Sequence, residues 1–427
     1  MVKQAVIIAG GKGKRLKDIT GNKPKILVDI DGKTLLDFQI NYLKSQKISK
    51  VHFCLGIGSK EIIDSLQSVD LDYTYSIEEQ PLGTYGALQN AYNFLEDEFF
   101  VIYGDILTNF DIQFEFNKFE QLDSDIHLIV RYTNHPQDSD IVKISNLNSV
   151  ENIDSSENFE FPYIPIGNSA LFFAKKKSIK SENILIPSDI FKDFVKTNLN
   201  KLNITCSFSI DYIRDVGTLE RYHKEVPNYK NKAKRPYKIA LIDRDGTLIK
   251  DQGNENDLKK LKFNSEILKV VSYLQKNYFK IFLVSNQPGI AKGFFDNSKV
   301  YKFHSLIQHK LIEKNLNPLD GIYICPHHPE KGHPGENKEL KINCNCRKPK
   351  SGLFDQIKID HNLKNSEYIV IGDSLADYGF AKSIKSEFFL FESELTEVHE
   401  FDKIGISKFN KADDLVMEIN QLDIMKN

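Results

Sequence analysis

Short apolar runs that end in Gly or Asp recur along this chain of 427 residues, and they restrict its fold more than any other feature. The runs are residues 5–9, 99–103, 239–242, 281–284 and 368–371. Each suits a strand that is buried on both faces, and helical patterns such as residues 35–43 lie between them. This alternation predicts an α/β fold with mostly parallel sheets, whose ligands bind where the strands end.

Length and composition predict two globular domains of ordinary charge. The chain is too long for one ordinary domain, and its 57 Lys and Arg against 59 Asp and Glu leave a net charge of -2. No apolar run reaches the roughly 18 residues of a membrane span, and residues 5–9 are too few for a secretory signal. We expect a cytoplasmic protein that binds neither nucleic acid nor membrane, and the oligomeric state stays open.

A basic segment with two prolines marks the expected domain boundary. Residues 224–238 contain six Lys or Arg residues, Pro227 and Pro236, and little apolar content. This composition is typical of a solvated linker; a polyanion-binding patch is the alternative. We predict a first domain over residues 1–226, a linker over 227–237 and a second domain over 238–427.

Two carboxylates, Asp243 and Asp245, follow the apolar run 239–242. The first can attack phosphorus and the second can transfer a proton, while magnesium neutralises the phosphate oxygens. Ser285-Asn286 and Arg347-Lys348 can bind the transferring phosphoryl group, and Gly372-Asp373-Ser374, with Asp377 further on, ends the apolar run 368–371. The set predicts a phosphoryl-transfer site.

Three of the five cysteines crowd with a histidine into one segment, as Cys325, His327, Cys344 and Cys346. Sixteen residues separate the Cys-x-His pair from the Cys-x-Cys pair. Three thiolates and one imidazole complete a tetrahedral zinc site, and a site filled by protein ligands is structural. It would pin the loop that ends in Arg347 and Lys348.

A glycine-rich turn, Gly10-Gly11-Lys12-Gly13, follows the first apolar run. Glycines allow backbone N–H groups to approach a triphosphate, although a tight strand-to-helix turn would also explain them. A tight turn alone would not explain why Arg15 and Lys25 follow the glycines. These two cations can hold phosphates and the leaving pyrophosphate. Asp105 and Asp215 each lie beside a glycine and can jointly hold magnesium.

With these motifs, about the first 225 residues resemble the sugar-phosphate nucleotidyltransferases. The matching elements are residues 9–16, 24–25, 79–84, 104–105 and 215–218. The resemblance implies a Rossmann-like mixed sheet and attack of a sugar 1-phosphate on the α-phosphorus of a nucleoside triphosphate. The element at 79–84 is most similar to guanylyltransferases for mannose-like sugars, so GTP is the expected nucleotide. The resemblance implies catalysis by Arg15 and Lys25, magnesium on Asp105 and Asp215, and nucleotide contacts from Ala9, Gly10, Gly11, Gly13, Glu79, Pro81, Gly83, Gly104 and Asp105.

Two positions depart from that family. Lys14 stands where the family usually has Thr. The Glu-Lys-Pro element that holds the sugar phosphate in many members is missing between Val142 and Phe161, where Lys143 is the candidate replacement. The residue that holds the sugar phosphate therefore stays open, and a non-catalytic nucleotide-binding regulatory module is an alternative for this domain.

The chain from Tyr237 onward resembles the haloacid dehalogenase superfamily of phosphatases, with a Rossmann-like domain. The resemblance implies that Asp243 forms an aspartyl-phosphate and that Asp245 is the acid and base. It implies magnesium on Asp243, Asp245 and Asp373, and phosphate contacts from Thr247, Ser285, Asn286, Arg347 and Lys348. The zinc loop is most similar to that of heptose 1,7-bisphosphate phosphatases. Histidinol-phosphate phosphatases are near relatives, and residues 251–256 match the heptose pattern only partly.

The two implied activities are consecutive. Removal of the C7 phosphate from a heptose 1,7-bisphosphate leaves a heptose 1-phosphate, which suits the first domain. We therefore expect a bifunctional enzyme of GDP-heptose synthesis for surface glycans, with magnesium in both domains and structural zinc in the second. A histidinol phosphate or a nucleic-acid phosphate end is the alternative phosphatase substrate.

Overall fold

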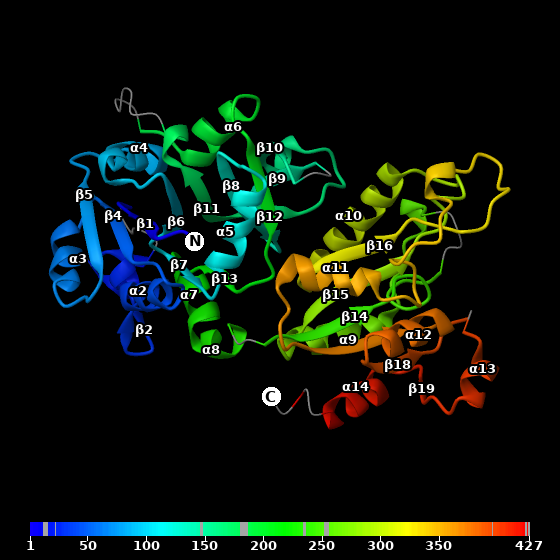
Figure 1. Ribbon diagram of the computed structural model, residues 1–427. Coiled ribbons are helices and arrows are strands. Elements are labelled where there is room, and N and C mark those ends of the chain that lie inside the picture. The colour runs from blue at the N-terminus through cyan, green and yellow to red at the C-terminus, as the bar shows by residue number, and fades with distance from the viewer. Residues whose placement is uncertain are drawn as a thin grey trace. The chain divides into compact units, whose positions relative to one another are not determined.

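The chain folds into two compact units in a computed structural model (Figure 1), which describes residues 1–11, 16–21, 23–145, 148–179, 187–233, 236–251, 256–394, 396–422 and 425. The first unit comprises residues 1–131, 135–159 and 166–233, and the second comprises 132–134, 160–165 and 234–427. The main division, after Ala233, lies in the predicted linker. Within that segment Tyr229 packs edge-on against Phe38 at 5.6 Å between ring centroids, so residues 227–233 belong to the first unit.

A nine-stranded mixed sheet forms the centre of the first unit. Its main path is β10-β9-β11-β6-β1-β4-β5, while β8 pairs with β11 and β12. The strands are β1 (Gln4–Ala9), β4 (Lys50–Leu55), β5 (Asp72–Ile77), β6 (Glu98–Tyr103), β8 (Ile126–Tyr132), β9 (Asp140–Ile144), β10 (Val150–Ser155), β11 (Ile166–Lys175) and β12 (Ile204–Phe208). The predicted strands at 5–9 and 99–103 are confirmed as β1 and β6, which pair in parallel.

Two small sheets and several helices accompany this sheet. Strands β2 (Asp29–Ile30) and β3 (Lys33–Thr34) form a hairpin, and β7 (Ile106–Thr108) pairs with β13 (Ile213–Asp215), which lies far along the chain. The helices are α1 (Lys17–Thr20), α2 (Leu35–Ser45), α3 (Ser59–Leu66), α4 (Gly83–Asn90), α5 (Ile112–Gln121), the π-helix η7 (Ile190–Val195), α6 (Lys196–Asn198), α7 (Leu219–Glu225) and α8 (Tyr229–Lys232). Helix α2, the predicted helix at 35–43, begins at a capping box in which Thr34 and Asp37 satisfy each other's backbone N–H groups.

A six-stranded parallel sheet in the order β16-β15-β14-β17-β18-β19 forms the centre of the second unit. Its strands are β14 (Lys238–Ile242), β15 (Lys280–Asn286), β16 (Gly321–Cys325), β17 (Glu367–Gly372), β18 (Glu387–Phe391) and β19 (Lys408–Phe409). The predicted strands at 239–242, 281–284 and 368–371 are confirmed. The helices are α9 (Ser265–Lys276), α10 (Asn297–Glu313), α11 (Gly352–His361), α12 (Leu375–Ser383), α13 (Val398–Lys403) and α14 (Ala412–Gln421).

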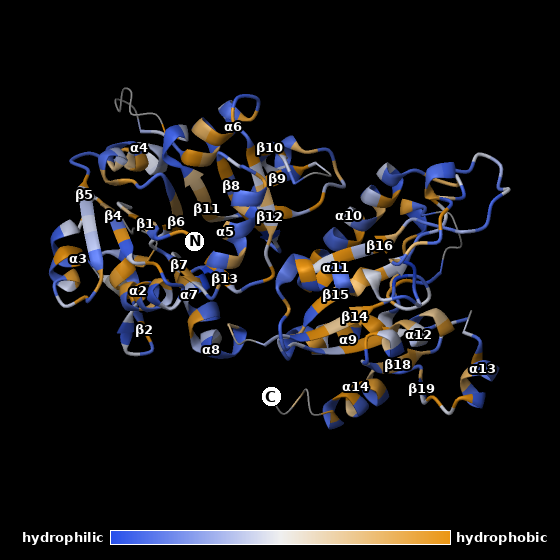
Figure 2. Cartoon of the chain, in the orientation of Figure 1, coloured by the Kyte–Doolittle hydropathy of each residue, from blue (hydrophilic) through white to orange (hydrophobic). Residues whose placement is uncertain are grey.

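Alternate residues of the central strands enter different hydrophobic layers. Ala240 and Ile242 of β14 belong to one buried cluster with residues of α9, α10 and α14. Phe282 of β15 instead packs against His361 of α11, at 5.2 Å between ring centroids. Figure 2 shows the apolar colour along β14, as expected for a strand buried on both faces. Among the described residues, no helix has the length and apolar content needed to span a membrane.

Candidate active sites

Parallel strands bring the predicted phosphoryl-transfer residues of the second unit to one edge of its sheet. Asp243 follows β14, Ser285 and Asn286 end β15, and Asp373 follows β17. Lys348 reaches the same edge from a loop, and its ammonium group lies 2.5 Å from Asp243 Oδ1. The strand order therefore assembles groups that are more than 100 residues apart in the chain, as for Asp243 and Lys348.

Three buried carboxylates, Asp243, Asp373 and Asp377, each offer an oxygen within 4.8 Å of the other two. Burial raises the pKa of Asp243 well above its ordinary value although Lys348 opposes the shift, and burial raises the pKa of Asp373 to about 6. A cation among these carboxylates would stabilise their charged forms, so the group can hold a metal ion.

Lys348 uses three hydrogen bonds inside this cluster. Its Nζ donates to Asp243 Oδ1 and Asp377 Oδ1, both at 2.5 Å, and to the Val284 carbonyl at 2.8 Å. Burial alone would lower the pKa of Lys348, but the two carboxylates raise it above its ordinary value. Lys348 is therefore a permanent positive charge beside Asp243.

Gly246 allows the Asp243 loop to approach Asp373. Its φ is +84°, and a Cβ built there would lie 2.0 Å from Asp373 Oδ2. The same Asp373 oxygen accepts a hydrogen bond from Ser393 Oγ at 2.7 Å. The loop and the carboxylate are thus in contact at a spacing that only glycine permits.

The side chain of Asp245 does not join the carboxylate cluster. Arg244 Nε donates to Asp245 Oδ2 at 2.9 Å, and Gln287 Nε2 donates to the same oxygen at 2.8 Å. Arg244 is buried, donates to Gln287 Oε1 at 2.8 Å, and lies 3.1 Å from His304 Nε2. Burial lowers the pKa of His304 well below its ordinary value, so a neutral imidazole can accept from Arg244. This network fixes the position of the Asp245 carboxylate.

The other predicted phosphate contacts lie around the same edge. Asn286 accepts from the Lys348 backbone N–H at 2.9 Å and donates to the Lys348 carbonyl at 3.1 Å. Ser285 Oγ is buried and accepts from Gln287 at 2.9 Å. Thr247 is buried and its Oγ1 has no hydrogen-bond partner. Arg347 donates to the His327 carbonyl at 3.4 Å, which places it beside the cysteine cluster.

Cys325, His327, Cys344 and Cys346 converge as predicted, with one ligand atom from each within 4.8 Å of the others. The Sγ atoms of Cys325 and Cys344 lie 3.5 Å apart, and His327 Nδ1 lies 3.1 Å from Cys346 Sγ. Three sulfur atoms and one imidazole nitrogen are a donor set for a tetrahedral, four-ligand metal site. Cys325 ends β16, so the cluster is attached to the same edge of the sheet as Asp243.

In the first unit, Lys25, Asp105 and Asp215 converge on Gly217. A Cβ at Gly217 would lie 2.6 Å from Asp105 Oδ2, 2.7 Å from Asp215 Oδ1 and 2.9 Å from Lys25 Nζ. Lys25 and Asp105 form an ion pair at 3.2 Å. Burial and the neighbouring Asp215 raise the pKa of Asp105, so a cation would stabilise this pair of carboxylates.

The predicted glycine-rich turn begins at the end of β1. Ala9 ends the strand and Gly10 and Gly11 follow it, while Gly13 and Arg15 lie outside the described residues. Gly104 follows β6, and a Cβ there would lie 3.1 Å from Ala9 Cβ. The ends of β1 and β6 are therefore side by side, as a nucleotide site at this edge requires.

Residues 78–84 contribute in a way that differs in detail from the prediction. Glu79 and Pro81 are exposed, whereas Glu78 is half-buried and accepts from the Leu82 N–H at 3.1 Å. A Cβ at Gly10 would lie 2.5 Å from Glu78 Oε1. Gly83 has a φ of +74°, and a Cβ there would lie 2.4 Å from the Ser188 carbonyl. Glu78, not Glu79, therefore lies against the glycine-rich turn.

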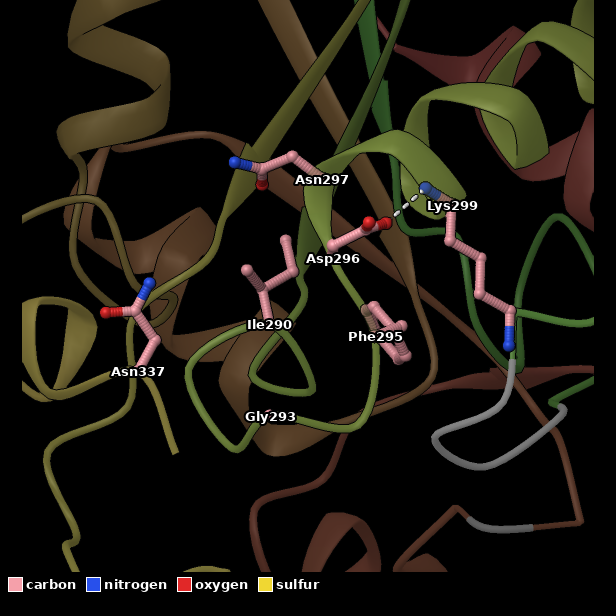
Figure 3. A pocket seen from close by; sticks show the side chains of 7 residues that line it. All are labelled: Ile290, Gly293, Phe295, Asp296, Asn297, Lys299 and Asn337. Carbon is pink, nitrogen blue, oxygen red and sulfur yellow. Dashed lines mark hydrogen bonds between the residues drawn. The ribbon is translucent and has the colours of Figure 1, made fainter. Parts of the chain in front are cut away.

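A depression of about 540 Å³ lies beside the loop that follows Asn286. Figure 3 shows Ile290, Phe295, Asp296, Lys299 and Asn337 around it, with Asp296 accepting from the Lys299 backbone N–H at 2.8 Å. None of the predicted site residues lines it.

Each half of the chain matches a known family. Residues 4–232 match the family described as nucleotidyl transferase, and residues 238–393 match that described as polynucleotide kinase 3 phosphatase. The D-glycero-beta-D-manno-heptose-1,7-bisphosphate 7-phosphatase of Haemophilus ducreyi is 36% identical over 140 residues, 33% of this chain and 74% of that protein. The D-glycero-alpha-D-manno-heptose 1-phosphate guanylyltransferase of Campylobacter jejuni is 31% identical over 222 residues, 52% of this chain and 97% of that protein. The first half of the chain belongs to the nucleotidyl transferase family, and the second half belongs to the family of the Haemophilus phosphatase.

The first unit is therefore a nucleotidyl transferase unit and the second a phosphatase unit. Among solved structures, HddC from Yersinia pseudotuberculosis is 30% identical, covers 54% of this chain and 100% of its own, and has a TM-score of 0.46. The fusion inferred from the sequence motifs is confirmed by the two family matches.

Two residues of these sites have weak signals in the sequence, whereas Asp377, which was predicted with Asp373, lies in the first turn of α12. Gln287 directly follows Ser285-Asn286, but its contact with Asp245 depends on the tertiary fold. Arg244 lies between two acids, and its burial could not be inferred from that position.

Proposed function

We propose that the chain is a bifunctional enzyme that converts a heptose 1,7-bisphosphate into a nucleotide-activated heptose. The convergence of Asp243, Asp373, Asp377 and Lys348 at one sheet edge carries the proposal for the phosphatase unit. The names of the Haemophilus and Campylobacter relatives specify heptose phosphates, and this supports heptose phosphates as the class of substrate. The products of the first reaction are then a heptose 1-phosphate and orthophosphate.

In the phosphatase unit, an Asp243 oxygen attacks the phosphorus of the C7 phosphate. The bond between phosphorus and the sugar oxygen breaks, and Asp245 gives its proton to that oxygen. Water then attacks the aspartyl-phosphate while Asp245 takes up a proton, and orthophosphate leaves. Lys348 balances negative charge beside Asp243, and Arg244 with Gln287 orients Asp245.

The donor sets fit the two metals expected for this unit. Asp243, Asp373 and the Asp245 carbonyl would hold Mg²⁺, with Asp377 near them, because Mg²⁺ prefers oxygen ligands. Bound there, Mg²⁺ supplies charge stabilisation for the transferring phosphoryl group. Cys325, His327, Cys344 and Cys346 would hold a structural Zn²⁺ and fix the loop that presents Lys348.

In the transferase unit, an oxygen of the heptose 1-phosphate attacks the α-phosphorus of a nucleoside triphosphate, and pyrophosphate leaves. GTP is the proposed nucleotide, supported by the guanylyltransferase relative. Asp105 and Asp215 would hold Mg²⁺, while Lys25 and Arg15 stabilise the phosphates. Ala9, Gly10, Gly11, Gly13, Gly104, Pro81, Gly83 and one of Glu78 and Glu79 would surround the nucleotide.

The proposal is tested by supplying heptose 1,7-bisphosphate, GTP and magnesium and measuring orthophosphate and pyrophosphate separately. Both products are expected, and the absence of either refutes bifunctionality. Asp243→Asn removes the nucleophile, so it should abolish orthophosphate release and leave nucleotidyl transfer to supplied heptose 1-phosphate intact. Loss of both activities in a folded Asp243→Asn protein would contradict independent sites.

Parallel assays distinguish the alternatives. Histidinol phosphate and a 3′-phosphorylated oligonucleotide should be poor phosphatase substrates compared with heptose bisphosphate. Pyrophosphate release with none of a panel of sugar 1-phosphates and four nucleotides would favour a non-catalytic nucleotide-binding unit instead.

A further inference from the structure

Arg131, on β8 of the transferase unit, is a largely buried cation without a compensating partner. Its Nε is buried and has no hydrogen-bond partner. The structure gives its side chain no ion pair within the described residues. Burial and the neighbouring Arg214 lower the pKa of Arg131 to about 9, so it stays protonated at neutral pH in surroundings that disfavour its charge. A buried charge in this state is costly unless a ligand of opposite charge completes the site.

The carboxylates near Arg131 already have other partners. Its electrostatic neighbours are Arg214, Glu225, Arg221 and Asp215. Glu225 accepts from Lys232 and from the Tyr212 hydroxyl, both at 3.0 Å, and lies 3.9 Å from Arg214. Arg221 is paired with Asp215. The group therefore has more positive than negative charge, and Arg131 is its uncompensated member.

These cations border the reaction centre of the transferase unit. Asp215, the partner of Arg221, converges with Lys25 and Asp105 on Gly217. Arg214 precedes Asp215 on β13, and Arg221 lies on α7, which begins four residues after Asp215. An anion bound by the arginines would lie next to the carboxylates proposed to hold magnesium, which is where an attacking phosphate must be.

Lys143, the candidate from the sequence, is placed differently. Its side chain is 56% exposed and forms an ion pair of 2.9 Å with Glu151 across the β9–β10 hairpin. Lys143 therefore has a partner already and is open to solvent, in contrast to Arg131.

We propose that Arg131, together with Arg214 and Arg221, binds the phosphate of the sugar 1-phosphate acceptor. The inference rests on the proposed nucleotidyl transfer. The planar guanidinium of Arg131 can donate two parallel hydrogen bonds to two phosphate oxygens, and its buried position strengthens both. The dianion of a phosphate monoester supplies the negative charge that the arginine group lacks.

The test compares Michaelis constants for the two substrates of the transferase unit. In Arg131→Gln, the KM for heptose 1-phosphate should rise about 10- to 100-fold while the KM for GTP stays unchanged, because one charged hydrogen-bonding group is lost. Arg131→Lys keeps the charge but loses the two parallel hydrogen bonds. Its KM for heptose 1-phosphate should therefore lie between those of the wild type and of Arg131→Gln. Inorganic phosphate should compete with heptose 1-phosphate in the wild type and lose this effect in Arg131→Gln.

Matched controls separate a binding role from a structural one. Lys230→Gln removes an exposed lysine paired with Asp31 and should change no constant. The thermal unfolding transition of the transferase unit in each variant reports whether that unit is folded. If Arg131→Gln does not fold, the result for Arg131→Lys decides, and this variant should raise the KM for heptose 1-phosphate alone.

The possible results lead to distinct conclusions. A wild-type chain that releases no pyrophosphate refutes the proposed transferase function. An active wild type whose Arg131 variants keep the KM for heptose 1-phosphate and the inhibition by phosphate refutes the arginine site. A raised KM in Lys143→Gln without one in Arg131→Gln would also overturn it.

Discussion

Replacing Gly246 by alanine should disable the phosphatase unit through a single methyl group. A Cβ at this position would lie 2.0 Å from Asp373 Oδ2, whereas real Cβ atoms essentially never approach a heavy atom closer than 3.0 Å. Either the loop that carries Asp243 and Asp245 or the Asp373 carboxylate must therefore move by at least the 1.0 Å difference. A displacement of about 1 Å in a catalytic group can lower a rate about 100-fold, which is the loss we expect in orthophosphate release.

The same substitution also strains the backbone, because Gly246 has a φ of +84°. An L-residue in the left-handed region costs roughly 1–2 kcal/mol, and this cost is independent of Asp373. Gly405→Ala is the matched control in the phosphatase unit, since Gly405 has a φ of +69° and nothing within 4 Å of the built Cβ. Both variants should lower the melting temperature similarly, but only Gly246→Ala should lose phosphatase activity.

The assay measures orthophosphate release against magnesium concentration, with pyrophosphate release from heptose 1-phosphate and GTP as an internal reference. Gly246→Ala should show a lower maximal rate and require more magnesium, while its pyrophosphate release stays normal. If Gly246→Ala matches Gly405→Ala in rate and in magnesium dependence, the contact with Asp373 does not limit the site and the reasoning fails.

Two further predictions concern the cysteine cluster and a buried histidine. Cys344→Ser removes one of four metal ligands, so the protein should lose its zinc and its orthophosphate release but keep pyrophosphate release; metal analysis that finds zinc retained would contradict this. Burial lowers the pKa of His52 to about 4 from 6.5, so the unfolded chain takes up the proton first. Stability of the transferase unit should therefore fall by about 3 kcal/mol as the pH drops from 6.5 to 4. His52→Gln, which cannot titrate, should show a shallower decline in melting temperature over this range, and an equal decline would refute the linkage.

The positions of Asp243, Ser285 and Asp373 could be predicted because each follows an apolar run. Parallel pairing of β14 with β15 and β17 places the ends of these runs at one edge, so a local pattern determines a long-range arrangement. The cysteine cluster could also be predicted, because three cysteines and a histidine, which are scarce residues and good metal ligands, lie close together in the sequence.

Other features depend on contacts that no short pattern contains. Arg131 is an ordinary strand residue in the sequence, and its significance comes from Arg214 and Arg221, far along the chain. Glu78 and Glu79 are adjacent and chemically identical, so only the path of the chain after β5 decides which one lies against Gly10. The predicted linker contains Tyr229, whose packing on Phe38 could not be inferred from a basic composition.

The three hydrogen bonds of Lys348 limit how the phosphatase unit can hold a phosphate. An ammonium group has three N–H donors, and Asp243, Asp377 and the Val284 carbonyl occupy all of them. A phosphate oxygen gains a bond from Lys348 only when one of these acceptors gives it up, so association is an exchange with little net gain in free energy. The reverse exchange restores the resting bonds as orthophosphate departs. We therefore expect the phosphatase unit to release orthophosphate readily and to be inhibited only weakly by added orthophosphate.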